Sequence, residues 1–267
     1  MKSITKTSPG ARSKTRETLR GAQTLHRAIA VLRCVAEGGH QGRRGSEIAA
    51  DTGLHVATAS RLLVALALEG LVEQVDDTRR YRVGPEILAL NMRANRSFAI
   101  ERILQPACRR IADITHDTVF LMVRSGFSAV CICREEGSSP VKTMTLDIGD
   151  RRPLGVSAGG LALLAFSPSY EYEQLIVNNA DDYAEYGETV EQIRDFVERT
   201  RRNGYAFNDE RIIPRVSSIA VPIHSFSGRA IAAVTVVAVS DRLKAARRAE
   251  LLQLIARELA PVVPIID

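Results

Sequence analysis

The stretch AADTGLHVATASRLLVALALEGLVEQ, residues 49–74, holds two helical patterns with almost no loop between them. Gly53 stands where the first pattern stops, and a glycine there can take the left-handed conformation that closes a helix. The apolar residues of the second pattern recur at the spacing of one helix face: Ala59, Leu62, Leu63 and Leu66. A short helix, a tight turn and an amphipathic helix in this order predict a helix-turn-helix.

A further helix is predicted upstream of this pair. Its apolar residues recur at helical spacing and stop at EGGHQG: Leu25, Ala28, Ile29, Leu32 and Val35. Ser46 is the predicted N-cap of the helix that Gly53 ends, and Glu47 lies in its first turn, where the helix dipole favours an acid. Three helices would then precede the hairpin described next.

The hairpin is predicted from LVEQ and YRVG, with DDTRR at its tip. A helix whose exposed N-terminal part is short, polar and basic suits the major groove, and tip arginines suit the backbone or the minor groove. The residues predicted to contact DNA are Ser46, His55, Thr58, Ser60, Arg61, Arg79 and Arg80. We therefore expect a winged helix-turn-helix DNA-binding domain over residues 21–83. The alternative is a winged helix that mediates protein contacts.

The distribution of charge agrees with a polyanionic partner for this part of the chain. The formal net charge of +5 divides into +5 for residues 1–20, +2 for residues 21–98 and −2 for residues 99–267. Residues 1–20 are expected to form a disordered basic tail. Apolar runs reach nowhere near the ~18 residues of a membrane span, and the four cysteines are scattered, so we expect a cytoplasmic protein without membrane contact.

A second domain is predicted after a linker helix over residues 84–98, with Pro85 at the helix start. Residues 99–267 alternate between helical and strand-like patterns. The predicted helices cover residues 100–116, 157–178, 188–202 and 243–263, and the predicted strands cover residues 118–125, 128–135, 141–147, 217–225 and 230–239. This order predicts an α+β sensor domain.

Several motifs together resemble the isocitrate-lyase-regulator (IclR) family of bacterial transcription factors. They are the winged helix, the linker helix, GDRRPLGVSAGGLALLA (149–165), GYAFNDE (204–210) and VSSIAVPI with GRAIAAVTV. The resemblance implies a ligand-responsive regulator with a GAF-like effector domain, assembled as a dimer or tetramer on operator DNA. The chain departs from the family pattern at three places: Leu161 where Lys is usual, Arg215 where Gly is common, and Ala57 at the helix entry.

The resemblance also implies an effector site, formed by Met144, Arg152, Ala158, Gly159, Asp209, Ser218, Thr235 and Val237. Small residues at a helix N-terminus would let a carboxylate approach the free N–H groups, and Arg152 could add a bidentate contact. The implied ligand is a small organic acid, with aromatic catabolites in that class, and no cofactor or metal is expected. Arg152 could instead be a surface or dimer-interface charge.

Two patterns suggest other chemistry. GVSAG, residues 155–159, matches the nucleophile elbow of serine hydrolases, with Ser157 as nucleophile, His224 as base and Asp181, Asp182 or Asp209 as the acid. The stretch before it is polar rather than a buried strand, so the expectation is a protein that is not an enzyme. Cys131 and Cys133 would face one side of a strand, as buried small hydrophobes or as a redox or metal pair.

Overall fold

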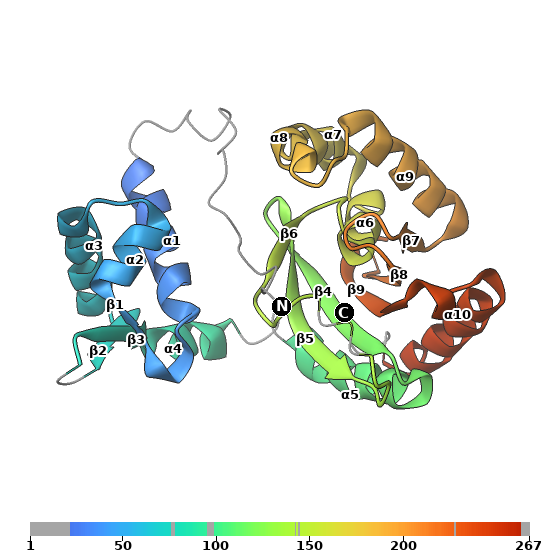
Figure 1. Ribbon diagram of the computed structural model, residues 1–267, viewed down its shortest axis with the longest axis horizontal. Helices are drawn as coiled ribbons and strands as arrows, with labels where there is room; N and C mark the ends of the chain where they lie inside the picture. Colours follow the sequence, from blue (N-terminus) through green and yellow to red (C-terminus); the bar gives the residue numbers. More distant parts are fainter. Residues whose placement is uncertain are drawn as a thin grey trace. The chain divides into compact units, whose positions relative to one another are not determined.

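The computed structural model describes residues 22–75, 78–94, 99–141, 143, 145–226 and 228–262. The chain divides into two compact units, Met1–Phe98 and Ala99–Asp267, each described here by itself (Figure 1). The tail predicted over residues 1–20 and the tip residues Asp76 and Asp77 lie outside the described residues. None of the helices in the described ranges is long and apolar enough to cross a membrane.

The first unit contains three helices, α1 to α3, with a small antiparallel sheet, followed by the additional helix α4. Its elements in chain order are α1 (Gln23–Ala36), η2 (Gly39–Gln41), β1 (Arg43–Arg44), α2 (Gly45–Thr52), α3 (Val56–Leu68), β2 (Val72–Val75), β3 (Arg80–Val83) and α4 (Glu86–Arg93). The strand order is β1-β3-β2, so β3 lies in the middle of the sheet. Helix–turn–helix and hairpin follow one another as predicted.

The turn between α2 and α3 has the predicted cause. Gly53 adopts the left-handed conformation with φ 64° and ψ 24°, and its N–H continues the α2 hydrogen bonding. In α3 the side chains of Ala59, Leu63 and Leu66 are buried, and Leu62 is partly buried against the same core. The amphipathic pattern of the sequence therefore packs as predicted.

Helix α1 forms where it was predicted; Val31, Cys34 and Val35 pack into the core, while Leu25 and Ile29 are 62% and 36% exposed. One prediction for the first unit was wrong. Ser46 lies inside α2 rather than at its N-cap, which is Arg44. The reason is that the Glu47 carboxylate accepts a hydrogen bond from the backbone N–H of Arg44 at 3.0 Å, so the helix starts earlier.

The second unit is built on a six-stranded antiparallel sheet with the order β6-β5-β4-β9-β8-β7. The strands are β4 (Thr118–Ser125), β5 (Ser128–Glu136), β6 (Arg151–Pro153), β7 (Ala206–Asp209), β8 (Val216–His224) and β9 (Ala230–Val239). The helices are α5 (Ala99–Thr115), α6 (Ala158–Ala165), α7 (Ser169–Asn178), α8 (Ala180–Ala184), α9 (Val190–Asn203) and α10 (Ala245–Leu259), with the short η3 (Ser240–Arg242) before α10.

Helices cover both faces of this sheet, which gives the unit two cores. One face packs against α5 and α10 through Leu121 and Val234, and the other packs against α6 and α9 through Phe120 and Met122 (Figure 1). Alternate residues of β4 and β9 are therefore buried on opposite sides, which explains why both strands read as continuous apolar runs.

The second unit differs from the prediction at several elements. The described residues among 141–147 form no strand, and the Thr143 hydroxyl instead donates to the carbonyl of Val237 at 2.9 Å. The helix predicted over residues 157–178 is split into α6 and α7 at Pro168, which has no N–H to continue a helix. Strand β7, residues 206–209, was not predicted at all.

Cys131 and Cys133 lie on opposite faces of the sheet, not on one face. The pairing of β5 with β4 shifts between Leu121 and Met122, so Ile132 is an extra residue that reverses the alternation. Cys131 is buried in the core under α6 and Cys133 in the core under α5. Burial raises the pKa of each thiol to about 12, and the described residues hold no cluster of three metal ligands. Both cysteines are therefore apolar core residues.

The loop between β7 and β8 contains a strained residue that generates a stability prediction. Arg215 has φ 64°, a conformation that costs a non-glycine residue about 1–2 kcal/mol. Arg215→Gly should remove this cost at a smaller entropic penalty, so the melting temperature should rise by about 1–4 °C. Thermal denaturation of the full chain measures this.

The matched control is Arg202→Gly in α9, where the backbone is helical and the side chain is exposed. This substitution should lower stability by about 1 kcal/mol. A lower melting temperature for Arg215→Gly as well would show that the left-handed backbone at position 215 carries no strain.

Candidate functional site

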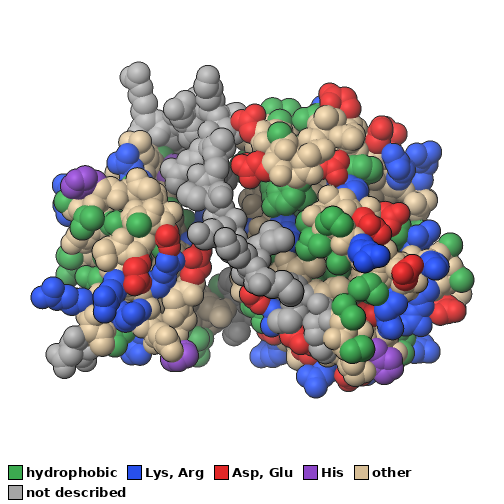
Figure 2. Space-filling model, in the orientation of Figure 1, with side chains coloured by type: hydrophobic (Ala, Val, Ile, Leu, Met, Phe, Trp, Pro, Cys, Tyr) green, Lys and Arg blue, Asp and Glu red, His purple; other side chains and the backbone are tan. Residues whose placement is uncertain are grey.

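A hollow on the first unit lies between the start of α2, the start of α3 and the hairpin. Its lining is formed by Arg44, Gly45, Ser46, Val56, Ser60, Leu63, Gln74, Thr78, Arg79 and Tyr81. Ser46, Ser60 and Arg79 were predicted to contact DNA, and the structure brings these three together. Arg side chains gather at the hairpin end of the unit, in blue at the lower left of Figure 2.

The other residues predicted to contact DNA do not line this hollow, and one of them, Arg80, forms a hydrogen bond within the protein. His55 is the exposed N-cap of α3, Thr58 is partly buried, and Arg61 is exposed one residue after Ser60. Arg80 is partly buried, and its guanidinium donates to the carbonyl of Gly42 at 2.9 Å. Arg80 therefore holds the hairpin against the loop before α2, and Arg79 is the freer cation of the two.

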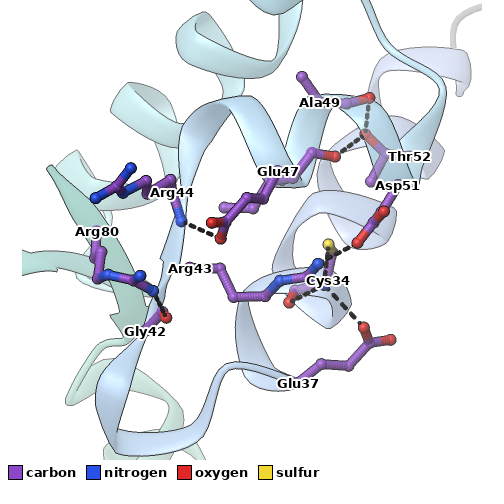
Figure 3. A network of polar contacts seen from close by, with 11 residues as sticks. Cys34, Glu37, Gly42, Arg43, Arg44, Glu47, Ala49, Asp51, Thr52 and Arg80 are labelled. Carbon is purple, nitrogen blue, oxygen red and sulfur yellow. Dashed lines mark hydrogen bonds and ion pairs between the residues drawn. The ribbon is translucent and has the colours of Figure 1, made fainter.

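A polar network fixes α2, and with it the start of α3, against α1 (Figure 3). Arg43 donates to the Cys34 thiol and to the Glu37 carboxylate at 3.0 Å each, and it forms an ion pair with Asp51. One side chain thus joins the end of α1 to Asp51 near the end of α2. Sequence reasoning missed this role and missed Arg44 in the hollow, although the Arg43–Arg44 pair directly before α2 was a visible signal.

The second unit contains a cavity between the sheet, the N-terminus of α6 and the β7–β8 loop. It holds about 420 Å³ of atom-free space, part of which is open to solvent. Six residues predicted for the effector site line it: Arg152, Ala158, Gly159, Ser218, Thr235 and Val237. Met144 lies outside the described residues.

Asp209 does not line the cavity. Its side chain is exposed and accepts a hydrogen bond from the Ser217 hydroxyl at 2.9 Å. Because neighbouring residues of a strand point to opposite faces, Asn208 takes the place on the cavity side, across from Ser218. Asn208 donates to the carbonyl of Val156 at 3.1 Å, which ties β7 to the segment before α6.

The apolar wall of the cavity was missed from the sequence. It consists of Phe120, Met122, Leu146, Ile212, Ile213 and Val216. The period-two alternation of β4 could have identified Phe120 and Met122. Ile212 and Ile213 lie in a loop without periodicity, so no sequence signal marks them.

Gly159 is packed closely against the sheet, so the absence of its side chain does not leave empty space for a ligand. A Cβ atom at this position would lie 2.7 Å from Met122 Cγ and 2.8 Å from Thr235 Oγ1. The glycine is therefore needed so that α6 can approach β4 and β9. A large residue here would displace the helix rather than only fill the cavity.

The cavity gathers polar groups that lack a charged partner or a hydrogen-bond partner among the described residues. Arg152 donates to the carbonyl of Thr145 at 2.8 Å, and no carboxylate among the described residues forms an ion pair with it. Burial lowers the pKa of Arg152, because a desolvated cation is disfavoured. The Thr235 hydroxyl is buried without a hydrogen bond. Across the described part of the chain, the N–H groups of Ala158 and Gly159 also have no hydrogen-bond acceptor.

Ser157 has a structural role at the start of α6. Its hydroxyl accepts a hydrogen bond from the N–H of Gly160 at 3.1 Å, which makes it the N-cap. His224, the histidine that a hydrolase would need, packs edge-on against Phe166 at the other end of α6. Eight residues of helix, about 12 Å, separate the two ends. The geometry gives the nucleophile elbow no base.

Ser157→Ala should therefore behave as the loss of a helix cap. We expect a decrease of about 1 kcal/mol in the free energy of unfolding, measured by chemical denaturation. Wild type and variant should be equally inactive toward 4-nitrophenyl acetate. Ester hydrolysis by the wild type that the substitution removes would restore the hydrolase interpretation.

A winged helix joined in one chain to an α+β domain that contains a cavity is the architecture of a transcription regulator with an effector domain. Two family descriptions match: the IclR helix-turn-helix domain over residues 24–76, and the bacterial transcriptional regulator IclR C-terminal domain over residues 92–261. The chain belongs to the IclR family of transcription regulators. This confirms the resemblance and the predicted fold class.

The relatives are regulators rather than enzymes. The glycerol operon regulatory protein of Streptomyces coelicolor is 32% identical over 236 residues, which are 84% of this chain and 87% of that protein. An IclR transcriptional regulator from Alicyclobacillus acidocaldarius has a TM-score of 0.72 at 20% identity, covering 91% of this chain and 98% of its own. An IclR homologue from Microbacterium hydrocarbonoxydans, solved with 4-hydroxybenzoate, has a TM-score of 0.72 at 22% identity, covering 91% and 99%.

Proposed function

We propose that this regulator binds operator DNA as a symmetric dimer and that a small carboxylate in the second unit changes its affinity for that DNA. The observation that carries the proposal is the cavity in which Arg152 forms no ion pair with any carboxylate of the described residues. Burying a charge without a partner costs free energy, and a bound carboxylate would offset that cost. The free N–H groups at the start of α6 would favour the same anion.

The lining of the cavity agrees with a small organic acid. The lining combines the cation of Arg152, the N-terminus of α6 and the hydroxyls of Ser218 and Thr235 with apolar side chains such as Phe120 and Met122. A ligand with a carboxylate and an apolar body matches both parts. The structure of the relative with 4-hydroxybenzoate makes this compound a reasonable first probe.

Pairing of two chains is proposed because a single winged helix covers only one half-site, and closed two-fold symmetry is the commonest way to pair. Helix α4 carries Leu88, Leu90 and Met92 with exposures of 61%, 49% and 66%, and no described residue of α4 is buried. A second copy of the chain would cover these side chains. A dimer or a tetramer is then the expected species in solution.

The DNA surface is tested by two arginine substitutions. Arg61→Ala should weaken binding to a selected duplex by about 1–3 kcal/mol, because it removes a contact from the exposed face of α3. Arg79→Ala should weaken binding to all duplexes alike and reduce the salt dependence, as expected for a phosphate contact. Gel-shift titrations at several salt concentrations measure both.

Arg102→Ala is the matched control, because Arg102 is an exposed arginine of α5 in the other unit. It should leave DNA affinity unchanged. If the full chain selected no duplex from a random-sequence pool, the winged helix would have to serve protein contacts instead.

The effector site is tested by Arg152→Met, which keeps an unbranched apolar stem of similar length and removes the guanidinium and its charge. Carboxylate binding, measured by calorimetry with 4-hydroxybenzoate, benzoate and pyruvate, should fall about ten- to a hundredfold for each probe that the wild type binds. Without ligand the variant should be as stable as wild type or more stable, because a desolvated charge is removed.

The control for this experiment is Arg151→Met at the neighbouring position of β6. Arg151 donates to the Ser125 hydroxyl at 3.2 Å and does not line the cavity. Its substitution should leave carboxylate affinity within a few-fold of wild type. Unchanged affinity in Arg152→Met would move the anion site away from this cavity.

A further inference from the structure

Val56 is an apolar residue at the start of helix α3 that faces a hollow lined by several polar side chains. It is the first residue of α3, directly after the N-cap His55, and its side chain is 60% exposed. Nevertheless it lines the hollow that Arg44, Ser60 and Arg79 also line. An exposed valine alone needs no explanation, but here it stands among the side chains expected to meet DNA.

The position of Val56 on its helix decides which part of DNA it would meet. The first residues of a recognition helix lie against base edges in the major groove, while residues on the flanks meet the backbone. The one apolar group on a base edge in that groove is the 5-methyl group of thymine. A valine side chain suits such a contact, since branching at Cβ restricts its rotamers and fixes its two methyl groups in space.

We propose that Val56 is a specificity-determining residue that contacts the 5-methyl group of a thymine at one fixed position in each half-site of the operator. The proposal rests on the proposed function, because it requires α3 to enter the major groove. In this proposal Val56 distinguishes thymine from other bases through an apolar contact with the 5-methyl group. Its neighbours Ser60 and Arg61 would recognise bases or phosphates through hydrogen bonds instead.

The test removes single methyl groups from the DNA. The full chain is first used to select duplexes from a random-sequence pool. In the best duplex each symmetry-related thymine pair is then replaced by deoxyuridine, which lacks the 5-methyl group and keeps every hydrogen-bonding atom. For the wild type, replacement of one such thymine pair should lower the affinity by about fifteenfold. Loss of one buried methyl group lowers affinity by about fourfold, and the losses in the two half-sites multiply.

The same duplexes are then measured with Val56→Ala and with Val64→Ala. Val64 is a matched control, because it is an exposed valine of α3, 52% exposed, that does not line the hollow. Val56→Ala should bind the thymine and deoxyuridine duplexes with nearly equal affinity, and Val64→Ala should keep the wild-type difference. Both positions are exposed, so both variants should fold, which circular dichroism checks.

Three results would overturn the inference. The wild type could show no thymine pair whose methyl groups matter, or Val56→Ala could retain the full difference at the same pair. In both cases the proposed function would stand, because the selected duplex is bound. Failure of the wild type to select any duplex would overturn the proposed function, and the inference with it.

Discussion

The close approach of α6 to the sheet at Gly159 is the constraint on which the second unit depends. Only a glycine allows this contact, since a Cβ atom would come within 2.7 Å of Met122 Cγ. The contact holds the start of α6 beside β9, where Thr235 has a buried hydroxyl without a partner. Arg152 completes the cavity from β6. The packing of α6 therefore brings three kinds of hydrogen-bond donor to one cavity: the Arg152 guanidinium, the N–H groups at the start of α6 and the Thr235 hydroxyl.

In the first unit, polar contacts of Arg43 fix the helices to one another, whereas the second unit relies on the close packing at Gly159. Arg43 joins the end of α1 to Asp51 of α2, and Gly53 then turns the chain directly into α3. The exposed start of α3 is thereby presented next to the hairpin. The proposed regulation requires that a ligand in the cavity prefer one of two states of the chain. The cavity and the proposed DNA surface, which belong to separate units, would then be thermodynamically coupled.

The sequence was sufficient where one periodicity continued without interruption. It predicted α3, β4 and β9 closely, because their apolar spacing reflects one or two buried faces. It failed where a single residue changes the geometry: Ile132 adds a bulge that separates Cys131 from Cys133, and Pro168 divides a helical pattern. The same limit applies to the cavity, where a shift of one residue exchanges Asp209 for Asn208, and where Ile212 lies in an irregular loop.

The most direct test of the central claim is a reciprocal binding measurement on the full chain. Operator affinity is measured with and without a saturating carboxylate, and carboxylate affinity is measured with and without saturating operator duplex. Thermodynamic linkage requires both affinities to change by the same factor, typically about 5–150-fold. The account predicts equal factors well above one. A carboxylate that binds through Arg152 with the same affinity whether or not DNA is present would contradict it.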